Sequence, residues 1–337
     1  MTVKILRGDC RDVLKALPEC SIQCCVTSPP YYGLRSYLPD GHPEKHIEIG
    51  LEPTPDEYVA EMVAVFREVR RVLRDDGTLW LNIGDSYAST PPGNKTVGVS
   101  AKSGLNGVNS ASGRYRETLA AGHQTKRDTS RLEGIKPKDL LGIPWLLAFA
   151  LRADGWYLRS DIIWHKPNPM PESVRDRPTS AHEHVFLLTK AQRYFYDAGA
   201  IAEARDAESI EHHNKYFEAS KNYAAKYKAT PGQQPQTHGS MMPSGETRNA
   251  RNVWTIATQP FSGAHFATMP PDLAERCIKA GTKPGDTVLD PFGGAGTTGL
   301  VADRLNRNAV LIELNAEYRA LAADRLRSDA PLLAQVS

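Results

Sequence analysis

Short runs of apolar, often β-branched residues alternate along the chain with segments whose apolar positions repeat at helical spacing. This alternation of strand and helix patterns is typical of an α/β fold. Seven strands are predicted, and we expect them to form one large sheet. They lie at residues 3–6, 22–27, 78–83, 161–165, 184–189, 287–290 and 309–313.

The clearest predicted helix follows the second strand. Thr54 is placed to cap it, Pro55 suits its first position, and Glu57 completes a capping box. Asp76-Gly77 is expected to end it. Between these points an apolar stripe predicts the buried face, and it consists of Tyr58, Met62, Val65, Phe66, Val69 and Leu73.

Two segments break the alternation. Residues 88–138 have five glycines between Gly93 and Gly113 and little periodicity, so we interpret them as a long inserted loop. Residues 203–258 begin with a polar stretch, 203–228, that is predicted to be helical, and then become rich in Gln, Pro and Ser. The alternative for both segments is a solvated linker.

Composition and charge narrow the protein class. A chain of 337 residues with 40% hydrophobic and 24% charged residues can bury a core, which excludes a wholly disordered protein. No apolar run approaches the roughly 20 residues that span a bilayer, and Asp9 comes too early for an export signal, so we expect a cytoplasmic protein. The adjacent cysteines Cys24 and Cys25 are expected to be buried thiols in a strand, and no metal site is predicted. The net charge is only +2, but nine basic and three acidic residues lie between Lys95 and Lys138.

Residues 286–299 combine a predicted strand with a glycine-rich turn and the start of a helix. Gly294, Gly296 and Gly299 have the spacing G-x-G-x-x-G, which lets the backbone and the helix N-terminus approach a nucleotide-type ligand. Glu313 ends the next strand, seventeen positions after Gly296, where a carboxylate can accept hydrogen bonds from two ribose hydroxyls. By itself the pattern fits a nicotinamide cofactor as well as S-adenosylmethionine.

The strand at 22–27 runs directly into the turn Ser28-Pro29-Pro30-Tyr31, which the two prolines stiffen. The exocyclic amino group of a nucleobase is a poor nucleophile because its lone pair is delocalised into the ring. An enzyme must therefore hold both amino hydrogens with acceptors. The Pro29 carbonyl and Ser28 Oγ can supply them, and Tyr31 can stack on an extruded base. This turn favours methyl transfer over a dehydrogenase, in which it would have no role.

The sequence Thr27-Ser-Pro-Pro-Tyr31, followed far downstream by Asp290-Pro-Phe-Gly-Gly-Ala-Gly296, resembles the S-adenosylmethionine-dependent DNA amino-methyltransferases of the beta group. In that group the catalytic motif precedes the cofactor motif. The resemblance covers nearly the whole chain. Residues 163–171 and 177–183 resemble the target-base loop, and residues 261–270 resemble the segment that closes over the methionine part of the cofactor.

The resemblance implies a seven-stranded, mostly parallel, Rossmann-like methyltransferase sheet of order 3-2-1-4-5-7-6, with a circularly permuted motif order and an antiparallel seventh strand. Residues 1–197 and 259–337 would form its catalytic and cofactor halves, 88–138 a phosphate-contacting insertion, and 198–258 the target-recognition segment. The implied catalytic residues are Ser28, Pro29, Pro30 and Tyr31. The implied contacts to S-adenosyl-L-methionine are Asp9, Thr27, Phe261, His265, Asp290, Phe292, Gly293, Gly294, Gly296, Thr297, Glu313 and Asn315.

The implied activity is that of a site-specific methyltransferase that flips one base out of double-stranded DNA. Ser28 favours N4 of cytosine as the acceptor, because family members that act on adenine more often have Asp or Asn at this position. N6-adenine methylation is the first alternative, and a catalytically silent DNA-binding protein on the same fold is a remote one. The implied partners are double-stranded DNA and a cognate restriction endonuclease, with no membrane, and the chain would act as a monomer or homodimer.

Overall fold

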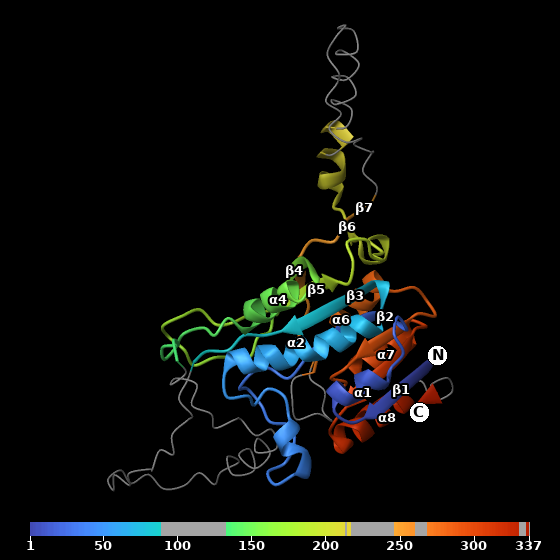
Figure 1. The fold of residues 1–337 in the computed structure, drawn as a ribbon. Coiled ribbons are helices and arrows are strands. Elements are labelled where there is room, and N and C mark those ends of the chain that lie inside the picture. Colours follow the sequence, from blue (N-terminus) through green and yellow to red (C-terminus); the bar gives the residue numbers. More distant parts are fainter. Residues whose placement is uncertain (89–132, 213, 217–245, 260–267, 330–334, 337) are drawn as a thin grey trace, which may run out of the picture. The chain divides into compact units, whose positions relative to one another are not determined.

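The computed structural model describes residues 1–88, 133–212, 214–216, 246–259, 268–329 and 335–336. The chain forms two compact units. The larger contains Met1–Tyr196 and Asn252–Ser337, and the smaller is Asp197–Arg251 (Figure 1). The smaller unit overlaps the segment assigned to target recognition, and that assignment stays a prediction. None of the helices in the described parts is long and apolar enough to cross a membrane.

In the part of the chain that the structure describes, the larger unit is built on a nine-stranded sheet of order β11-β1-β10-β9-β2-β3-β5-β4-β8. Within it β5 is antiparallel to both of its neighbours, and the other pairs are parallel. The central seven strands have the expected order, which confirms the Rossmann-like methyltransferase fold. The expected number of strands was too small, because the short β8 and β11 extend the two edges and carry too little pattern to be recognised. The strands are β1 (Thr2–Arg7), β2 (Ile22–Thr27), β3 (Leu73–Ile83), β4 (Tyr157–His165), β5 (His182–Thr189), β8 (Val253–Thr255), β9 (Thr287–Asp290), β10 (Asn308–Glu313) and β11 (Gln335–Val336).

Helices cover both faces of this sheet (Figure 1). α1, α2 and α4 pack against one another on one face, and α6, α7 and α8 pack on the other. Cys25 and Leu79 belong to the core under α2, whereas Cys24 faces α6, where a Cβ on Gly281 would lie 2.8 Å from Cys24 Sγ. Both adjacent cysteines are buried thiols, as predicted. The helices are α1 (Cys10–Ala16), α2 (Pro55–Val72), α4 (Ile143–Ala153), α6 (Pro271–Gly281), α7 (Thr297–Arg304) and α8 (Ala316–Asp329), with 3-10 turns η1 (Pro43–Ile47) and η4 (Gly199–Ile201).

α2 starts where the sequence predicted. Thr54 Oγ1 accepts a hydrogen bond from Glu57 N at 3.2 Å, and Glu57 Oε2 accepts one from Thr54 N at 3.0 Å, so the capping box is complete. The predicted end at Asp76-Gly77 was wrong, because the helix stops before Leu73. That residue is extended and pairs with Ile22 in the ladder between β2 and β3, so its side chain is buried in the sheet instead of continuing the helical stripe.

The two ends of the predicted insertion lie side by side. Ala88 N donates to the Asp139 carbonyl and Lys138 N donates to the Ala88 carbonyl, both at 2.8 Å. Residues 89–132 lie outside the described residues, so the loop predicted there stays a prediction.

The helix predicted over 203–228 does not begin at residue 203. Residues Glu203–Ala204 form strand β6, which pairs antiparallel with β7 (Thr247–Arg248), and the helix begins at residue 207. Glu203 Oε2 accepts from Arg251 Nε at 2.8 Å, which favours the extended pairing. Asp206 Oδ1 accepts from Ser209 N at 2.7 Å and so caps the helix. Residues 217–245 lie outside the described residues.

Candidate active site

The catalytic and cofactor motifs meet where β2 and β9 end, although they are far apart in the sequence (Figure 1). Thr27 Oγ1 donates to Asp290 Oδ1 at 2.6 Å, and Phe292 N donates to the same oxygen at 3.0 Å. The other Asp290 oxygen accepts from Thr298 Oγ1 at 2.8 Å. Burial raises the pKa of Asp290, and these three donors offset part of that effect. Thr27 and Asp290 therefore join the catalytic turn to the glycine loop.

The protein itself packs tightly around the glycine loop. A Cβ on Gly293 would lie 3.0 Å from Leu311 Cβ. Gly296 has a φ of +76°, and a Cβ there would lie 2.9 Å from Ala322 Cβ. Gly294, between them, has a φ of +49°. The sequence predicts that these glycines allow close approach of a ligand, but packing against β10 and α8 by itself favours glycine at positions 293 and 296.

Glu313 ends β10 beside this loop. Its Oε2 accepts from Gly294 N and its Oε1 accepts from Asn315 N, both at 2.8 Å. Burial raises the pKa of Glu313 from 4.5 to about 7, against the opposing effect of these N–H donors. Asn315 Nδ2 in turn donates to the Tyr37 carbonyl at 2.9 Å. The carboxyl group thus lies at the carboxyl ends of the parallel strands, where open α/β sheets bind ligands.

Two predicted cofactor residues have side chains that arginines already engage. Asp9 follows β1 and caps α1 by accepting from Arg11 N at 2.9 Å, and its Oδ2 accepts from Arg11 Nε at 3.0 Å. Thr297 Oγ1 accepts from Arg325 Nη1 at 2.9 Å. Asp9 is still close to Glu313, because β1 and β10 pair as far as their last residues. Neither arginine carries a local sequence signal that predicts this contact.

A polar network fixes Tyr31 of the catalytic turn. Its hydroxyl donates to Glu183 Oε2 at 2.6 Å and accepts from Ser28 Oγ at 3.4 Å. Asn82 Nδ2 donates to the same Glu183 oxygen at 3.0 Å, and Lys166 Nζ donates to the other. Burial, with the nearby Glu183 carboxylate, raises the pKa of the Tyr31 hydroxyl, which therefore stays protonated.

The two proline carbonyls of the turn differ in their partners. The Tyr58 hydroxyl donates to the Pro30 carbonyl at 2.8 Å, whereas no described residue donates to the carbonyl of Pro29, a buried residue. Gly84 covers one edge of the Tyr31 ring, because a Cβ there would lie 2.7 Å from Tyr31 Cε2. The turn thus leaves the Pro29 carbonyl as an acceptor that the described part of the protein does not use.

The structure brings the described residues of both motifs together at the carboxyl ends of the parallel strands. Phe261 and His265 lie outside the described residues, so their contacts stay predictions. The roles of Glu183 and Asn82 were missed. Glu183 stands between two histidines at the start of β5, and Asn82 is a single polar residue between apolar residues of β3. A polar residue in a buried strand is the signal that could have indicated them, since buried polar groups need partners.

Comparison with known proteins identifies the family. A family model for DNA methylases of the N6 and N4 type matches residues 22–324. The chain is 47% identical over 323 residues to type II methyltransferase M.XycI of Xanthomonas campestris pv. cyanopsidis, covering 96% of this chain and 87% of the relative. It is 45% identical over 325 residues to type II methyltransferase M.Cfr9I of Citrobacter freundii, covering 96% and 88%. The chain belongs to the N6/N4 DNA methylase family.

Two solved structures share the fold of this DNA methylase. The cytosine-N4-specific PvuII DNA methyltransferase aligns with a TM-score of 0.57 and 19% identity, covering 96% of this chain and 87% of that one. A putative DNA modification methylase of Thermus thermophilus, solved with S-adenosyl-L-methionine, aligns with a TM-score of 0.56 and 23% identity, covering 99% and 97%. Family membership confirms three expectations: the chain is an enzyme, it methylates DNA, and its cofactor is S-adenosyl-L-methionine.

Proposed function

We propose that this DNA methylase transfers the methyl group of S-adenosyl-L-methionine to N4 of a cytosine flipped out of duplex DNA. The observation that carries the proposal is the turn at Ser28, whose hydroxyl and Pro29 carbonyl provide two acceptors beside the cofactor loop. The bond between Thr27 and Asp290 fixes that adjacency. Two acceptors hold the two amino hydrogens and leave the nitrogen lone pair directed at the methyl group.

The hydrogen-bond chain from Ser28 through Tyr31 to Glu183 orients the acceptor. Ser28 donates its hydrogen to Tyr31, and Tyr31 donates its own to Glu183, so Ser28 Oγ presents lone pairs to the base. A serine hydroxyl does not ionise near neutral pH, so it cannot take the proton as a carboxylate can. The amino proton therefore leaves after methyl transfer and goes to water.

The chain's own residues fit the cofactor. S-adenosyl-L-methionine supplies an electrophilic methyl group when bound, and we infer that Glu313 accepts hydrogen bonds from its two ribose hydroxyls. Glu313 is a half-buried residue, and its carboxyl group accepts a hydrogen bond from Gly294 N. The carboxyl group is therefore a hydrogen-bond acceptor within a confined site, as ribose binding needs. We assign Asp9, Thr27, Asp290, Thr297 and Asn315 to shaping this site through the bonds described above, and Phe292, Gly293 and Gly296 to its wall.

The choice of base depends on Ser28. The resemblance to enzymes with Ser at this position favours N4 of cytosine over N6 of adenine. The cytosine-N4-specific PvuII enzyme has the same fold, but at 19% identity that likeness concerns the fold alone. Adenine N6 is the second candidate, because Ser28 Oγ and the Pro29 carbonyl can also hold the amino hydrogens of adenine.

Nucleoside mass spectrometry tests the choice of base. Duplex DNA that contains all short sequences is incubated with the protein and S-adenosyl-L-methionine, then digested to nucleosides. We expect 4-methylcytosine. A finding of 6-methyladenine without 4-methylcytosine would overturn the base assignment and leave the enzyme class standing. As a control, Ser28→Ala is expected to lower kcat while the affinity for S-adenosylhomocysteine is unchanged.

We propose further that residues 198–258 read the DNA sequence and that a cognate restriction endonuclease accompanies the enzyme. The first proposal is supported by the composition of this segment and its separation as a compact unit. The second is supported by the names of the two relatives, which are type II methyltransferases. Exchanging residues 198–251 for the matching segment of a relative with another target site is expected to change the methylated sequence.

A further inference from the structure

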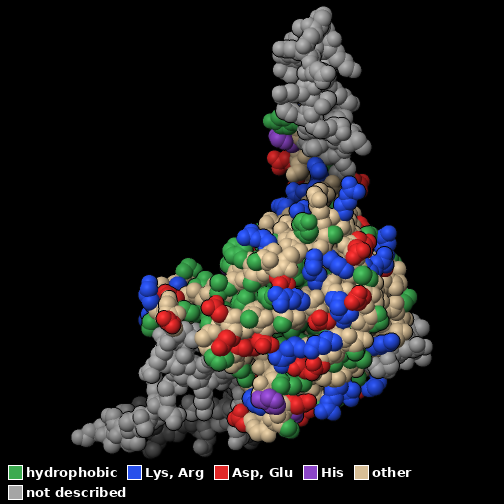
Figure 2. Space-filling model, viewed as in Figure 1, with side chains coloured by type: hydrophobic (Ala, Val, Ile, Leu, Met, Phe, Trp, Pro, Cys, Tyr) green, Lys and Arg blue, Asp and Glu red, His purple; other side chains and the backbone are tan. Residues whose placement is uncertain are grey.

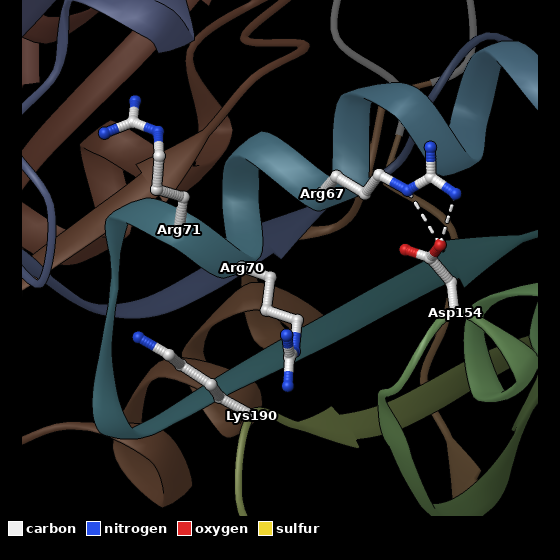
Figure 3. Close-up of a pocket in the computed structure, with 5 residues that line it drawn as sticks. All are labelled: Arg67, Arg70, Arg71, Asp154 and Lys190. Carbon is white, nitrogen blue, oxygen red and sulfur yellow. Dashed lines mark hydrogen bonds and ion pairs between the residues drawn. The ribbon is translucent and has the colours of Figure 1, made fainter.

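A basic pocket lies on the larger unit, away from the catalytic turn. Its volume is about 430 Å³, and three arginines of α2 line it together with two residues from other elements (Figure 3). Figure 2 shows basic and acidic side chains side by side over the face that carries α2. On such a surface most cations are paired with carboxylates. The pocket is a candidate anion site only if one of its cations lacks a partner. Its lining residues are Arg67, Arg70, Arg71, Asp154 and Lys190.

The pocket and Ser28 lie at opposite ends of the strands. Lys190 follows the last residue of β5, Thr189. Thr189 pairs with Thr78, the first residue of β3 in the ladder between these two strands. At the other end of the same ladder His184 pairs with Ile83, close to the catalytic turn. The two ends of this ladder are five residues apart, which corresponds to about 17 Å along a strand. The pocket is thus separate from the site for the cofactor and the target base.

Three of the four cations have protein partners. Arg67 Nε donates to Asp154 Oδ1 at 2.7 Å (Figure 3). Arg71 Nε donates to Glu68 at 2.8 Å, and its Nη2 donates to a carbonyl at the end of α1 at 2.7 Å. Lys190 Nζ donates to the Leu73 carbonyl at 2.9 Å. These bonds hold the walls of the pocket in place.

Arg70 is different. Its Nε is buried, and no described residue accepts a hydrogen bond from it. Its guanidinium lies next to Gly155 in the turn after α4. A Cβ at this glycine would be 3.8 Å from Nη2, so the guanidinium packs close to the backbone of the turn. A buried donor without an acceptor is costly, and a cation without a counter-charge is more so. Because Arg70 lines the pocket, an anion bound there can supply the missing counter-charge to its guanidinium.

We propose that this pocket binds a phosphate group, either free phosphate or a backbone phosphate of duplex DNA. A guanidinium forms paired bonds with two oxygens of a tetrahedral anion. The other three cations of the pocket already have carboxylate partners, so the phosphate compensates the charge of the Arg70 guanidinium. Neither source takes part in the proposed methyl transfer, so the pocket is a second anion site of the protein.

The test compares the full-length protein with Arg70→Gln in buffers that contain neither phosphate nor sulfate. The matched control is Arg327→Gln, because Arg327 is an exposed arginine on α8 that pairs with Asp324. Titration calorimetry with inorganic phosphate is expected to show binding to the wild type, at least tenfold weaker binding to Arg70→Gln, and unchanged binding to Arg327→Gln. Because Arg70 Nε has no described partner, Arg70→Gln is expected to unfold at the wild-type temperature or above it when phosphate is absent.

A second measurement separates the two sources. The logarithm of the affinity for duplex DNA is plotted against the logarithm of the salt concentration for the same three proteins. If the occupant is a backbone phosphate, Arg70→Gln lowers the slope by about 0.9. If the slope is unchanged while phosphate binding is lost, the ligand is free phosphate. Equal phosphate binding by the wild type and Arg70→Gln, together with equal slopes, overturns the proposal. Methylation of a short duplex is expected to proceed at the wild-type rate in all three proteins.

Discussion

The Glu313 carboxyl group is buried, and its spacing from Gly296 in the sequence predicts that it binds the ribose. Its pKa of about 7 means that about half of the ligand-free molecules carry a neutral carboxyl group near neutral pH. The folded state holds the proton more tightly than the unfolded state, whose Glu has a pKa near 4.5. Stability from this group is therefore full below pH 4.5 and is lost as the pH rises through 7.

Cofactor affinity should have the opposite pH dependence. An ionised carboxylate accepts hydrogen bonds from both ribose hydroxyls, so binding requires the proton to leave. From the pKa of about 7, the affinity for S-adenosylhomocysteine is expected to be roughly tenfold lower at pH 6 than at pH 8, with release of close to one proton at pH 6. Calorimetry in two buffers of different ionisation enthalpy measures both quantities.

The control for this prediction is Glu313→Gln. It removes charge-assisted hydrogen bonds that are worth about 1.5–3 kcal/mol, so affinity should fall roughly 10- to 100-fold and lose its dependence on pH between 6 and 8. A wild-type affinity that is the same at both pH values would contradict the assignment of the carboxyl group to the ribose.

Among the structural elements, those with local signals could be predicted and those fixed by distant contacts could not. The start of α2 is encoded within four residues by Thr54 and Glu57, so the sequence alone places it. Its end depends on the pairing of Leu73 with Ile22, about fifty positions away, which no local pattern reports. The catalytic turn likewise has a local motif. Glu183, which binds Tyr31, comes from a strand 152 positions later and has none.

Gly296 lies at the contact between α7 and α8, and we expect a side chain there to destabilise this contact. It caps α7 with φ 76° and ψ 19°, and Gly142 caps α4 with nearly the same values, φ 74° and ψ 21°. Only Gly296 has a close neighbour, since a Cβ at Gly142 would have nothing within 4 Å. Gly142→Ala should therefore cost about 1–2 kcal/mol of unfolding free energy for the left-handed backbone. Gly296→Ala should cost about 1–3 kcal/mol more, for the overlap with Ala322.

Urea unfolding of both glycine variants at one temperature checks this difference. Equal losses in the two variants would mean that α8 moves aside to accommodate the added methyl group. The comparison isolates the steric contact, because the two positions share the same backbone conformation and the same place at the start of a helix.

At the scale of the whole molecule, the order of the sheet explains how residues 27 and 290 come to share a site. β2 and β9 are adjacent, although the first is near the start of the chain and the second near its end. All described residues of the predicted site belong to the larger unit. Changes in the smaller unit should therefore leave cofactor affinity intact.

The basic insertion at residues 88–138, which belongs to the larger unit, allows a separate test of DNA binding. Its ends are bonded to each other through Ala88 and Asp139, so a deletion of residues 95–131 should leave the sheet in place. Seven basic and two acidic residues are lost with that deletion. If they contact the DNA backbone, each lost phosphate contact lowers the slope of log affinity against log salt by about 0.9, and the methylated sequence is unchanged. A full-length variant with the seven basic residues replaced by Gln should give the same slope as the deletion, which separates charge from chain length. An altered methylation site in either protein would instead make this segment part of sequence recognition.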